Sequence, residues 1–375
     1  MLNAKWVQHP GFYIREELEA RGWSQRDLAY ILGCPEQAVN LIITGKRGIS
    51  PEMAKALGEA FDVPAEFFAN LQKAYDLSRA REPDPGVSSR AKLQRVYPVR
   101  EMIKRGWIED SDPVMLEAQI AKFFEVPHMR EVPYLAHAAK KNNYEEKEIP
   151  PEQLAWLFRV RQIAKSVPVP KYSEQALHRA LPKLKQLLLE PKEIRHAPRI
   201  LMECGVRFIL VEILPQSKID GVCLWLDENS PVIGMSLRYD RIDNFWFLFR
   251  HEIEHVLKKH GHESEIIDVE LEGKRASSDS SLPEEEVIAN VAAADFCVPK
   301  DEIESFILRK QPFFSERDVL AFARHIHVHP GIAVGQIHAW TKRYDLLRKH
   351  LVRVRQFVLP GSIVDGWGQV APISL

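Results

Sequence analysis

The chain has 375 residues, of which 45% are hydrophobic and 27% charged, and this balance predicts a globular protein of two or three domains. The formal net charge of -1 excludes a general electrostatic attraction to nucleic acid, so any DNA binding must come from a local patch. No stretch reaches the roughly 18 apolar residues of a membrane span, and the four cysteines lack the spacing of a disulfide framework or a thiolate metal site, so we expect a cytoplasmic protein with no membrane partner.

The first 80 residues are predicted to form an all-α domain. Apolar residues recur at helical spacing from Phe12 to Leu32, and the pattern breaks at Gly22, after which Ser24 suits the N-cap of a second helix. A third helix is expected from Pro35 to about Ile43, after a tight turn at Gly33. Helices of about nine residues joined by a short glycine-containing turn have the proportions of a helix-turn-helix unit, whose second helix lies in the major groove.

The helix that starts at Pro35 carries side chains suited to reading bases. Gln37 and Asn40 can each pair with an adenine edge through two hydrogen bonds, whereas Lys46 and Arg47 would contact phosphates and fix the register. The alternative is a small helical bundle for protein contacts, which the acidic residues of the segment favour. The residues expected at DNA are Gln25, Gln37, Asn40, Thr44, Lys46 and Arg47.

Four motifs in this segment match a known family. They are HPG at His9, SQ at Ser24, GKRGIS from Gly45 and EFFANLQKAYDL from Glu66. With them, residues 9–77 resemble the HigA-type antitoxins of the Xre helix-turn-helix family. The resemblance implies a five-helix domain that usually dimerises on palindromic operators and often regulates its own promoter, so the expected partners are double-stranded DNA and a second copy of the chain.

The next hundred residues carry no recognisable chemistry. Residues 81–95 combine Pro, Gly, Ser and Arg, which predicts a linker between domains. Residues 96–190 are predicted to be a helical middle region, because amphipathic patterns at 115–126, 152–167 and 173–189 are separated by prolines.

Residues 191–306 change in character and predict a domain with a sheet. Three β-rich runs between Val206 and Leu237, separated by turns at 219–221 and 227–230, predict a small antiparallel sheet. An amphipathic helix comes next, with Asp243 as the expected N-cap and the sequence HEIEH, residues 251–255, in its interior. The fold class is therefore α+β and mostly helical.

The HEIEH sequence has the spacing of a metal site. His251 and His255 lie on one face of a helix and can bind one Zn²⁺ ion, which lowers the pKa of its bound water from near 16 to about 7. Glu252 lies beside them as a proton acceptor for peptide hydrolysis. A second helix after Pro283 offers Glu286 as a third ligand, although the same residue could be only part of a charged first turn. Asn290 shares the face of Glu286.

Residues 206–299 resemble the ImmA/IrrE family of metallopeptidases. The shared features are the IDG sequence at Ile219, FWFLFRHEIEH, and an ExxAN helix that ends in Val-Pro. The resemblance implies a zincin-like domain in which Glu286 is the third ligand and Glu252 the catalytic base. Many members have Gly where this chain has Glu254, and that carboxylate is expected to alter the active-site floor. Arg238 and Tyr239 are candidate oxyanion donors, with surface or packing roles as the alternative.

Residues 307–375 are predicted to contain two short helices around the HVHPG sequence and an irregular tail. This part resembles the small helix-turn-helix-like element that ends many ImmA/IrrE proteins. Three histidines at 325, 327 and 329 have no acidic or cysteine partner at suitable spacing, which indicates ordinary turn residues rather than a second metal site.

Two functions fit this organisation. The first is a transcriptional regulator with a zinc endopeptidase that cleaves a repressor or antitoxin in a stress or toxin–antitoxin response, with the chain's own DNA-binding half among the candidate substrates. The second is an antitoxin-like repressor, paired with a toxin, whose metal domain is a sensor or a partner-binding module without proteolysis.

Overall fold

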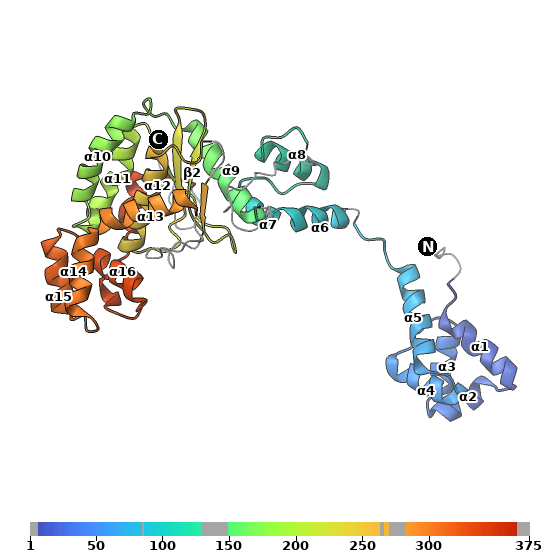
Figure 1. Ribbon diagram of the computed structural model, residues 1–375. Helices are drawn as coiled ribbons and strands as arrows, with labels where there is room; N and C mark the ends of the chain where they lie inside the picture. Colours follow the sequence, from blue (N-terminus) through green and yellow to red (C-terminus); the bar gives the residue numbers. More distant parts are fainter. Residues whose placement is uncertain (1–6, 85, 129–148, 263–265, 270–282, 366–375) are drawn as a thin grey trace. The chain divides into compact units, whose positions relative to one another are not determined.

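The computed structural model describes residues 7–84, 86–128, 149–262, 266–269 and 283–365 (Figure 1). Contacts group the chain into two units, residues 1–87 and residues 88–375. Among the described helices, none is long and apolar enough to cross a membrane.

The first unit is all-α, as predicted. Ser24 accepts a hydrogen bond from the Asp27 amide while the Asp27 carboxylate accepts one from the Ser24 amide, and this capping box starts the second helix. Gly22 and Gly33 end the first and second helices in the left-handed conformation. The core is a single cluster of buried aliphatic and aromatic side chains. The helices are α1 (Pro10–Arg21), α2 (Gln25–Leu32), α3 (Glu36–Ile43), α4 (Pro51–Phe61) and α5 (Ala65–Arg79).

The second unit begins with helices, one of which corrects the predicted linker. Residues 86–95 of that linker belong to a helix, because the Asp84 side chain accepts a hydrogen bond from the Gly86 amide and Leu93 is buried. The amphipathic patterns of the middle region are helices, as expected. The elements are α6 (Gly86–Val96), α7 (Val99–Lys104), α8 (Pro113–Phe123), α9 (Pro151–Ser166), α10 (Glu174–Gln186), the 3-10 helix η3 (Pro191–His196) and α11 (Ala197–Glu203).

The sheet is mixed, so the prediction of an antiparallel sheet is wrong. Its strand order is β4-β2-β3-β1-β5, in which β2 runs antiparallel to β3 and β4, whereas β1 runs parallel to β3 and β5. Residues 219–221, predicted as a turn, are instead the start of a strand. Gly221 pairs with both β3 and β4, whereas Ile219 pairs with β4 alone and the register to β4 shifts between these two residues. The strands are β1 (Arg207–Leu210), β2 (Ile219–Trp225), β3 (Pro231–Met235), β4 (Ile266–Val269) and β5 (Ile363–Val364).

Helices cover both faces of this sheet (Figure 1). Along β2, Cys223 and Trp225 belong to the same core cluster as α12 (Ile242–Leu257), whereas Val222 and Leu224 belong to the cluster of α9. Alternate residues of a strand point to opposite faces, so two apolar layers require an almost continuous apolar strand. All seven residues of β2 are buried accordingly.

The helix with the HEIEH sequence begins two residues earlier than predicted. Arg241 is the N-cap of α12, and Asp243, the expected cap, lies within the first turn and forms an ion pair with Arg241 at 2.7 Å. A carboxylate in the first turn is still favourable, because the helix dipole is positive there. Helix α13 (Glu284–Cys297) begins after Pro283 as predicted and packs along α12.

The C-terminal part contains the two predicted helices around HVHPG, but its last described residues are not an irregular tail. They end in β5, which joins the sheet, and Asp365 accepts hydrogen bonds from Trp107 and Arg159. The tail beyond residue 365 lies outside the described part. The elements are α14 (Lys300–Lys310), α15 (Glu316–His325), α16 (Pro330–Thr341), α17 (Arg355–Val358) and the 3-10 helices η5 (Arg348–His350) and η6 (Leu359–Gly361).

A histidine side chain caps α16 and is expected to make stability depend on pH. The Nδ1 atom of His329 accepts a hydrogen bond from the Gly331 amide at 3.1 Å, and burial lowers the pKa of His329. Since the folded pKa lies below the value near 6.5 of the unfolded chain, the stabilisation is complete above about pH 6.5 and is lost as the pH falls through the folded pKa.

We therefore expect His329→Ala to lower the free energy of unfolding at pH 7.5 by about 1 kcal/mol through the lost cap. His329→Asn keeps a capping acceptor that does not titrate, so its stability should fall less than that of the wild type between pH 7.5 and pH 5.5. Urea unfolding at both pH values measures this, and an unchanged pH slope in both variants would contradict it.

Candidate metal centre and DNA-reading face

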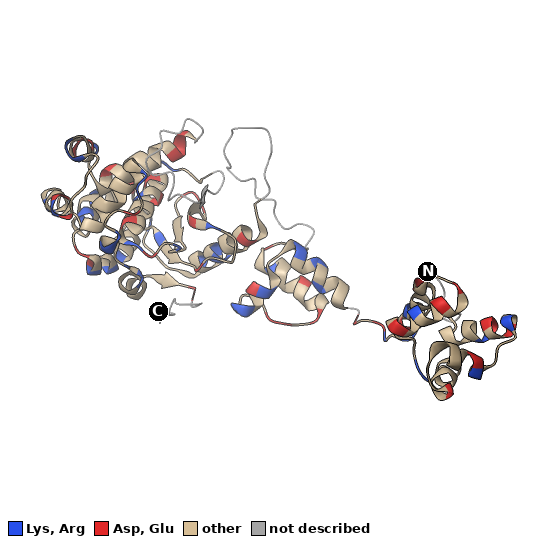
Figure 2. Cartoon of the chain, turned by 90° about the horizontal axis from the view of Figure 1, so that it is seen from below, with Lys and Arg blue, Asp and Glu red and all other residues tan. Residues whose placement is uncertain are grey.

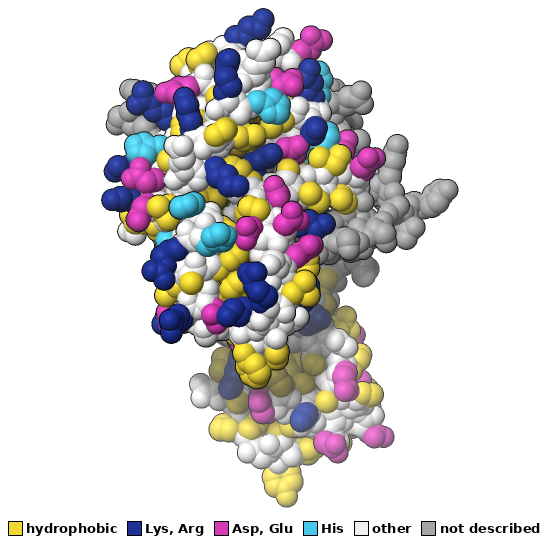
Figure 3. All heavy atoms as spheres, turned by 60° about the vertical axis from the view of Figure 1, so that its left-hand side comes forward, with side chains coloured by type: hydrophobic (Ala, Val, Ile, Leu, Met, Phe, Trp, Pro, Cys, Tyr) yellow, Lys and Arg dark blue, Asp and Glu magenta, His cyan; other side chains and the backbone are white. Residues whose placement is uncertain are grey.

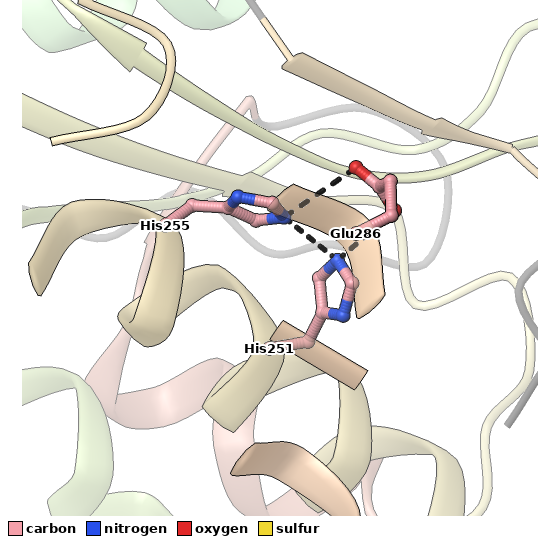
Figure 4. A group of neighbouring side chains, drawn as sticks. All are labelled: His251, His255 and Glu286. Atoms are coloured by element: carbon pink, nitrogen blue, oxygen red, sulfur yellow. Dashed lines mark hydrogen bonds and ion pairs between the residues drawn. The ribbon is translucent and has the colours of Figure 1, made fainter. Parts of the chain in front are cut away.

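Three side chains predicted as metal ligands lie together in the second unit (Figure 4). The Nε2 atoms of His251 and His255 are 2.9 Å apart, and each is 3.6 Å from one oxygen of the Glu286 carboxylate. Both imidazoles are fully buried, and the ligand atoms of the three residues lie within 4.8 Å of one another. Helix α12 supplies the two histidines and α13 supplies the glutamate.

The three side chains are spaced as ligands of a tetrahedral zinc ion would be. Ligands at zinc distances of about 2.0–2.2 Å are about 3.3–3.6 Å apart in a tetrahedron; the two Nε2 atoms are closer than this, at 2.9 Å, and each lies 3.6 Å from a different oxygen of Glu286. Two neutral nitrogens and one carboxylate oxygen are a donor set that zinc accepts. These residues could therefore hold the ion without a large rearrangement.

His260, which was not among the predicted site residues, orients one of the ligands. Its Nδ1 atom is 3.0 Å from Nδ1 of His255. Burial lowers the pKa of His260, which favours a neutral ring that can accept the Nδ1 proton of His255. The lone pair of His255 is then on Nε2, which faces the other two ligands. The sequence predicts His260 in the last turn of the helix, whereas α12 ends at Leu257 and His260 follows it.

Glu252 is fully buried next to the strand β2. A Cβ atom on Gly221 would lie 2.1 Å from Oε1 of Glu252, so only glycine leaves room for this carboxylate. On a helix with 100° between residues, Glu252 and Glu254 lie on opposite sides of the histidine pair. Gly221 was predicted only as part of a turn, so its role beside Glu252 could not be read from the sequence.

Glu254 is engaged away from the ligand group. Its Oε2 atom forms an ion pair with Arg250 at 2.6 Å, and Lys258 lies 3.9 Å from the other oxygen. The Arg250 guanidinium also lies 5.9 Å from the ring centre of Phe296 on α13. Glu254 thus pairs with the arginine that lies against α13.

Asn290 is buried one turn beyond Glu286 on α13. Within the described part of the chain, neither polar atom of its amide has a hydrogen-bond partner. A buried amide without a partner costs about 1–3 kcal/mol, so a bound group would find a ready donor and acceptor here. Arg238 and Tyr239, by contrast, lie before the start of α12, where the Arg238 guanidinium covers the Tyr239 ring and donates to the Lys218 carbonyl.

In the first unit, the predicted DNA-contacting residues gather around α3. Gln37 and Asn40 are exposed on that helix, and the Asn40 amide donates to Oε1 of Gln25 at 3.1 Å, which links the middle of α3 to the start of α2. This bond leaves the amide group of Gln25 able to donate elsewhere. The Thr44 hydroxyl donates to the Asn40 carbonyl at 2.7 Å and ends the helix.

The first unit carries both basic and acidic residues (Figure 2). Glu36 at the start of α3 forms an ion pair at 3.4 Å with Arg26, a highly exposed residue of α2 that was not among the predicted DNA contacts. Lys46 and Arg47 come after α3, and both are exposed, with their amides bonded to the Leu41 carbonyl. The charge of Glu36, one of the acidic residues that favoured a protein-binding bundle, is therefore offset at this face.

Comparison with known proteins identifies the first unit. The helix-turn-helix family matches residues 14–68. Virulence-associated protein A' of Dichelobacter nodosus is 41% identical over 75 residues, which are 20% of this chain and 65% of that protein. The HTH-type transcriptional regulator YbaQ of Escherichia coli K12 is 31% identical over 90 residues, 24% of this chain and 77% of that protein.

A solved structure, an addiction module antidote protein of a HigA family from Coxiella burnetii, is 33% identical, with a TM-score of 0.19, and the match covers 24% of this chain and 92% of that one. Through its first unit, the chain belongs to the helix-turn-helix family of DNA-binding regulators and has a domain of the Xre/HigA type.

The contact between Gly221 and Glu252 generates a testable prediction. Gly221→Ala should lower the free energy of unfolding by about 1–3 kcal/mol, because the added methyl overlaps the carboxylate. Glu252→Ala in the same chain removes the overlapping oxygen, so the double variant should be more stable than the sum of the single effects by at least about 0.5 kcal/mol. Urea unfolding of the four proteins measures this coupling, and strictly additive effects would show that the two residues do not constrain each other.

Proposed function

We propose that the chain is a DNA-binding transcriptional regulator whose second unit is a zinc-dependent endopeptidase of the ImmA/IrrE type. The observation that carries the proposal is the convergence of His251, His255 and Glu286 beside the buried carboxylate of Glu252. The substrate would be a repressor or an antitoxin, and the DNA-binding unit either brings the enzyme to its promoter or is itself cleaved.

In this proposal the two histidines and Glu286 hold the ion. When bound, zinc would act as a Lewis acid that lowers the pKa of a water molecule, so that the water can give up a proton near neutral pH and become a nucleophile. The Glu252 carboxylate takes a proton from the attacking water and delivers it to the nitrogen of the leaving amine. Asn290 offers its amide to the peptide backbone of the substrate. His260 keeps the His255 ring in the tautomer that binds the ion.

The first unit would bind a palindromic operator as a homodimer. Helix α3 would enter the major groove, where Gln37 and Asn40 meet base edges, while Gln25, Lys46 and Arg47 contact phosphates. Thr44 ends α3 next to these residues and would lie at the same stretch of the DNA backbone. The bond between Asn40 and Gln25 supports this arrangement, because it holds a base-reading side chain and a phosphate-contacting side chain in one rigid pair.

The alternative function is an antitoxin-like repressor in which the metal site only senses zinc or holds a partner such as a toxin. Two observations favour it. The curated relatives match the first unit, and one of them is named as a transcriptional regulator. The two functions differ in one property, which is whether Glu252 moves a proton during hydrolysis.

Glu252→Gln separates the two functions. We expect this variant to keep its zinc but to cleave candidate repressors and its own first unit at least about 100-fold more slowly than the wild type. His251→Ala should lose both zinc and cleavage. Elemental analysis gives the zinc content, and gel electrophoresis follows the cleavage.

Glu254→Gln is the matched control, because it changes a carboxylate on the same helix that lies outside the ligand group. It should retain zinc and cleavage. If the wild type and Glu252→Gln bind zinc equally and neither cleaves, the endopeptidase is refuted and the sensor is supported. If the wild type binds no zinc, both metal functions fail.

For DNA, Asn40→Ala and Lys46→Ala should have different effects. Asn40→Ala should weaken operator binding by about 1–3 kcal/mol and relax the preference at one position, whereas Lys46→Ala should weaken binding to all sequences and reduce the salt slope by about one. Fluorescence anisotropy with operator and scrambled duplexes at several salt concentrations measures both. Lys73→Ala on α5 is a charge-matched control that should change neither, and equal affinity of the wild type for both duplexes would exclude specific reading.

A further inference from the structure

A pocket of about 450 Å³ lies at the start of α12, at the other end of that helix from the ligand group. His251 comes nine positions after the first residue of α12, which is about 14 Å along the helix axis at 1.5 Å per residue. One wall of the pocket is residues 238–241, and the other comes from residues 348–355, more than a hundred positions later in the chain. The pocket is therefore separate from the metal centre.

Five arginines and a single carboxylate, Asp240, are among the residues that line it. The face of the second unit shown in Figure 3 has basic and acidic side chains interspersed. The pocket differs from that mixed surface, because guanidinium groups outnumber carboxylates in its lining. The arginines are Arg238, Arg241, Arg348, Arg353 and Arg355.

Carboxylates outside the lining hold some of these arginines in position. Arg241 pairs with Asp243 at 2.7 Å and Arg355 with Glu212 at 2.5 Å, and both guanidinium groups are largely buried. These two ion pairs reduce the rotamer freedom of the side chains, so a ligand would meet preorganised donors.

Asp240, the carboxylate in the lining, is bound by backbone amides. Its Oδ1 atom accepts hydrogen bonds from the amides of Val354 and Arg355 at 2.8 and 2.7 Å, which ties the second wall to the first. Arg348 and Arg353 are exposed on that second wall. Over the described part of the chain, no carboxylate lies within ion-pair distance of either of them, so their charges are available to an anion.

We propose that this pocket binds a phosphate-bearing small molecule of about nucleotide size. Guanidinium groups match the oxygens of a phosphate through paired hydrogen bonds, and two uncompensated arginines beside two fixed ones suit a group with more than one negative charge. A volume of about 450 Å³ is within the range of pockets for small ligands. A DNA duplex is a poor fit, because its backbone would have to enter a concave site.

The test is titration of the purified full chain with ADP and with pyrophosphate by isothermal calorimetry. We expect both to bind, and we expect the double variant Arg348→Gln, Arg353→Gln to bind at least about tenfold more weakly, because it removes two positive charges and their charge-assisted hydrogen bonds. Arg309→Gln is the matched control, since Arg309 is an exposed arginine at the end of α14 that lines no part of the pocket. It should bind as the wild type does.

His251→Ala distinguishes this pocket from the metal centre, because phosphates also bind zinc. Binding that persists in His251→Ala supports the pocket whether or not the proposed endopeptidase is correct, and binding that disappears with it assigns the phosphate to the metal and overturns the proposal. Unchanged affinity in the double arginine variant also overturns it. Competition by a DNA duplex that displaces ADP would assign the arginines to nucleic acid instead.

Discussion

Helix α12 buries two imidazoles and one carboxylate completely. The packing around α12 in the second unit must offset the free energy of removing these polar groups from water. Polar groups removed from water cost several kcal/mol unless they find partners. Glu286 lies 3.6 Å from both His251 and His255, but it can do so only if α13 approaches closely. Ala289 and Ala293 are the buried small residues that permit this approach. The close packing of α12 and α13 therefore also sets the positions of His251, His255 and Glu286 relative to one another.

The strand β2 extends that constraint to the other face of the site. Gly221 leaves room for Glu252, and its neighbour Asp220 lies 3.8 Å from Arg238 at the arginine pocket. Gly221 pairs with both β3 and β4, and Asp220 lies at the register shift between Ile219 and Gly221. A shift of one residue in this register would exchange the faces of the strand and put a side chain against Glu252. The two sites at opposite ends of α12 thus depend on the same strand.

Local patterns were enough to predict most helices and the three side chains, His251, His255 and Glu286, that the structure brings together. The spacing of the HEIEH sequence and the two prolines around α13 are properties of short segments, so the helices and the common face of the histidines can be derived from sequence. The direction of the strands cannot. Strand β1 adds next to β3 in parallel, and β5 comes from the far end of the chain. A run of apolar residues between turns contains no information about which edge of the sheet it will join.

The unpredicted parts of the sites have the same origin. His260 comes after the end of α12 and reaches His255 only because the chain turns back there, and the arginine pocket joins segments more than a hundred residues apart. Such contacts depend on tertiary packing, which residue spacing does not encode. The turn expected at residues 219–221 was wrong for a related reason. An Asp-Gly pair favours a turn in isolation, but here the glycine is needed for close approach to a buried side chain.

The HPG sequence occurs twice, and in both places it caps a helix, although the two helices have different roles. His9 and His329 each cap a helix by accepting a hydrogen bond from the glycine amide, and a Cβ on either glycine would lie 2.2 Å from a backbone oxygen. The same three residues therefore start α1 and α16 and bring each helix against a neighbour.

Burial along α16 then shows what this helix does in the fold. Residues 331–339 of α16 are all buried, whereas a helix that reads the major groove must expose one face to base edges, as α3 does. The likeness of the C-terminal element to a helix-turn-helix thus reflects shared capping and close packing, and α16 acts as a core helix against α12 rather than as a second DNA-reading helix.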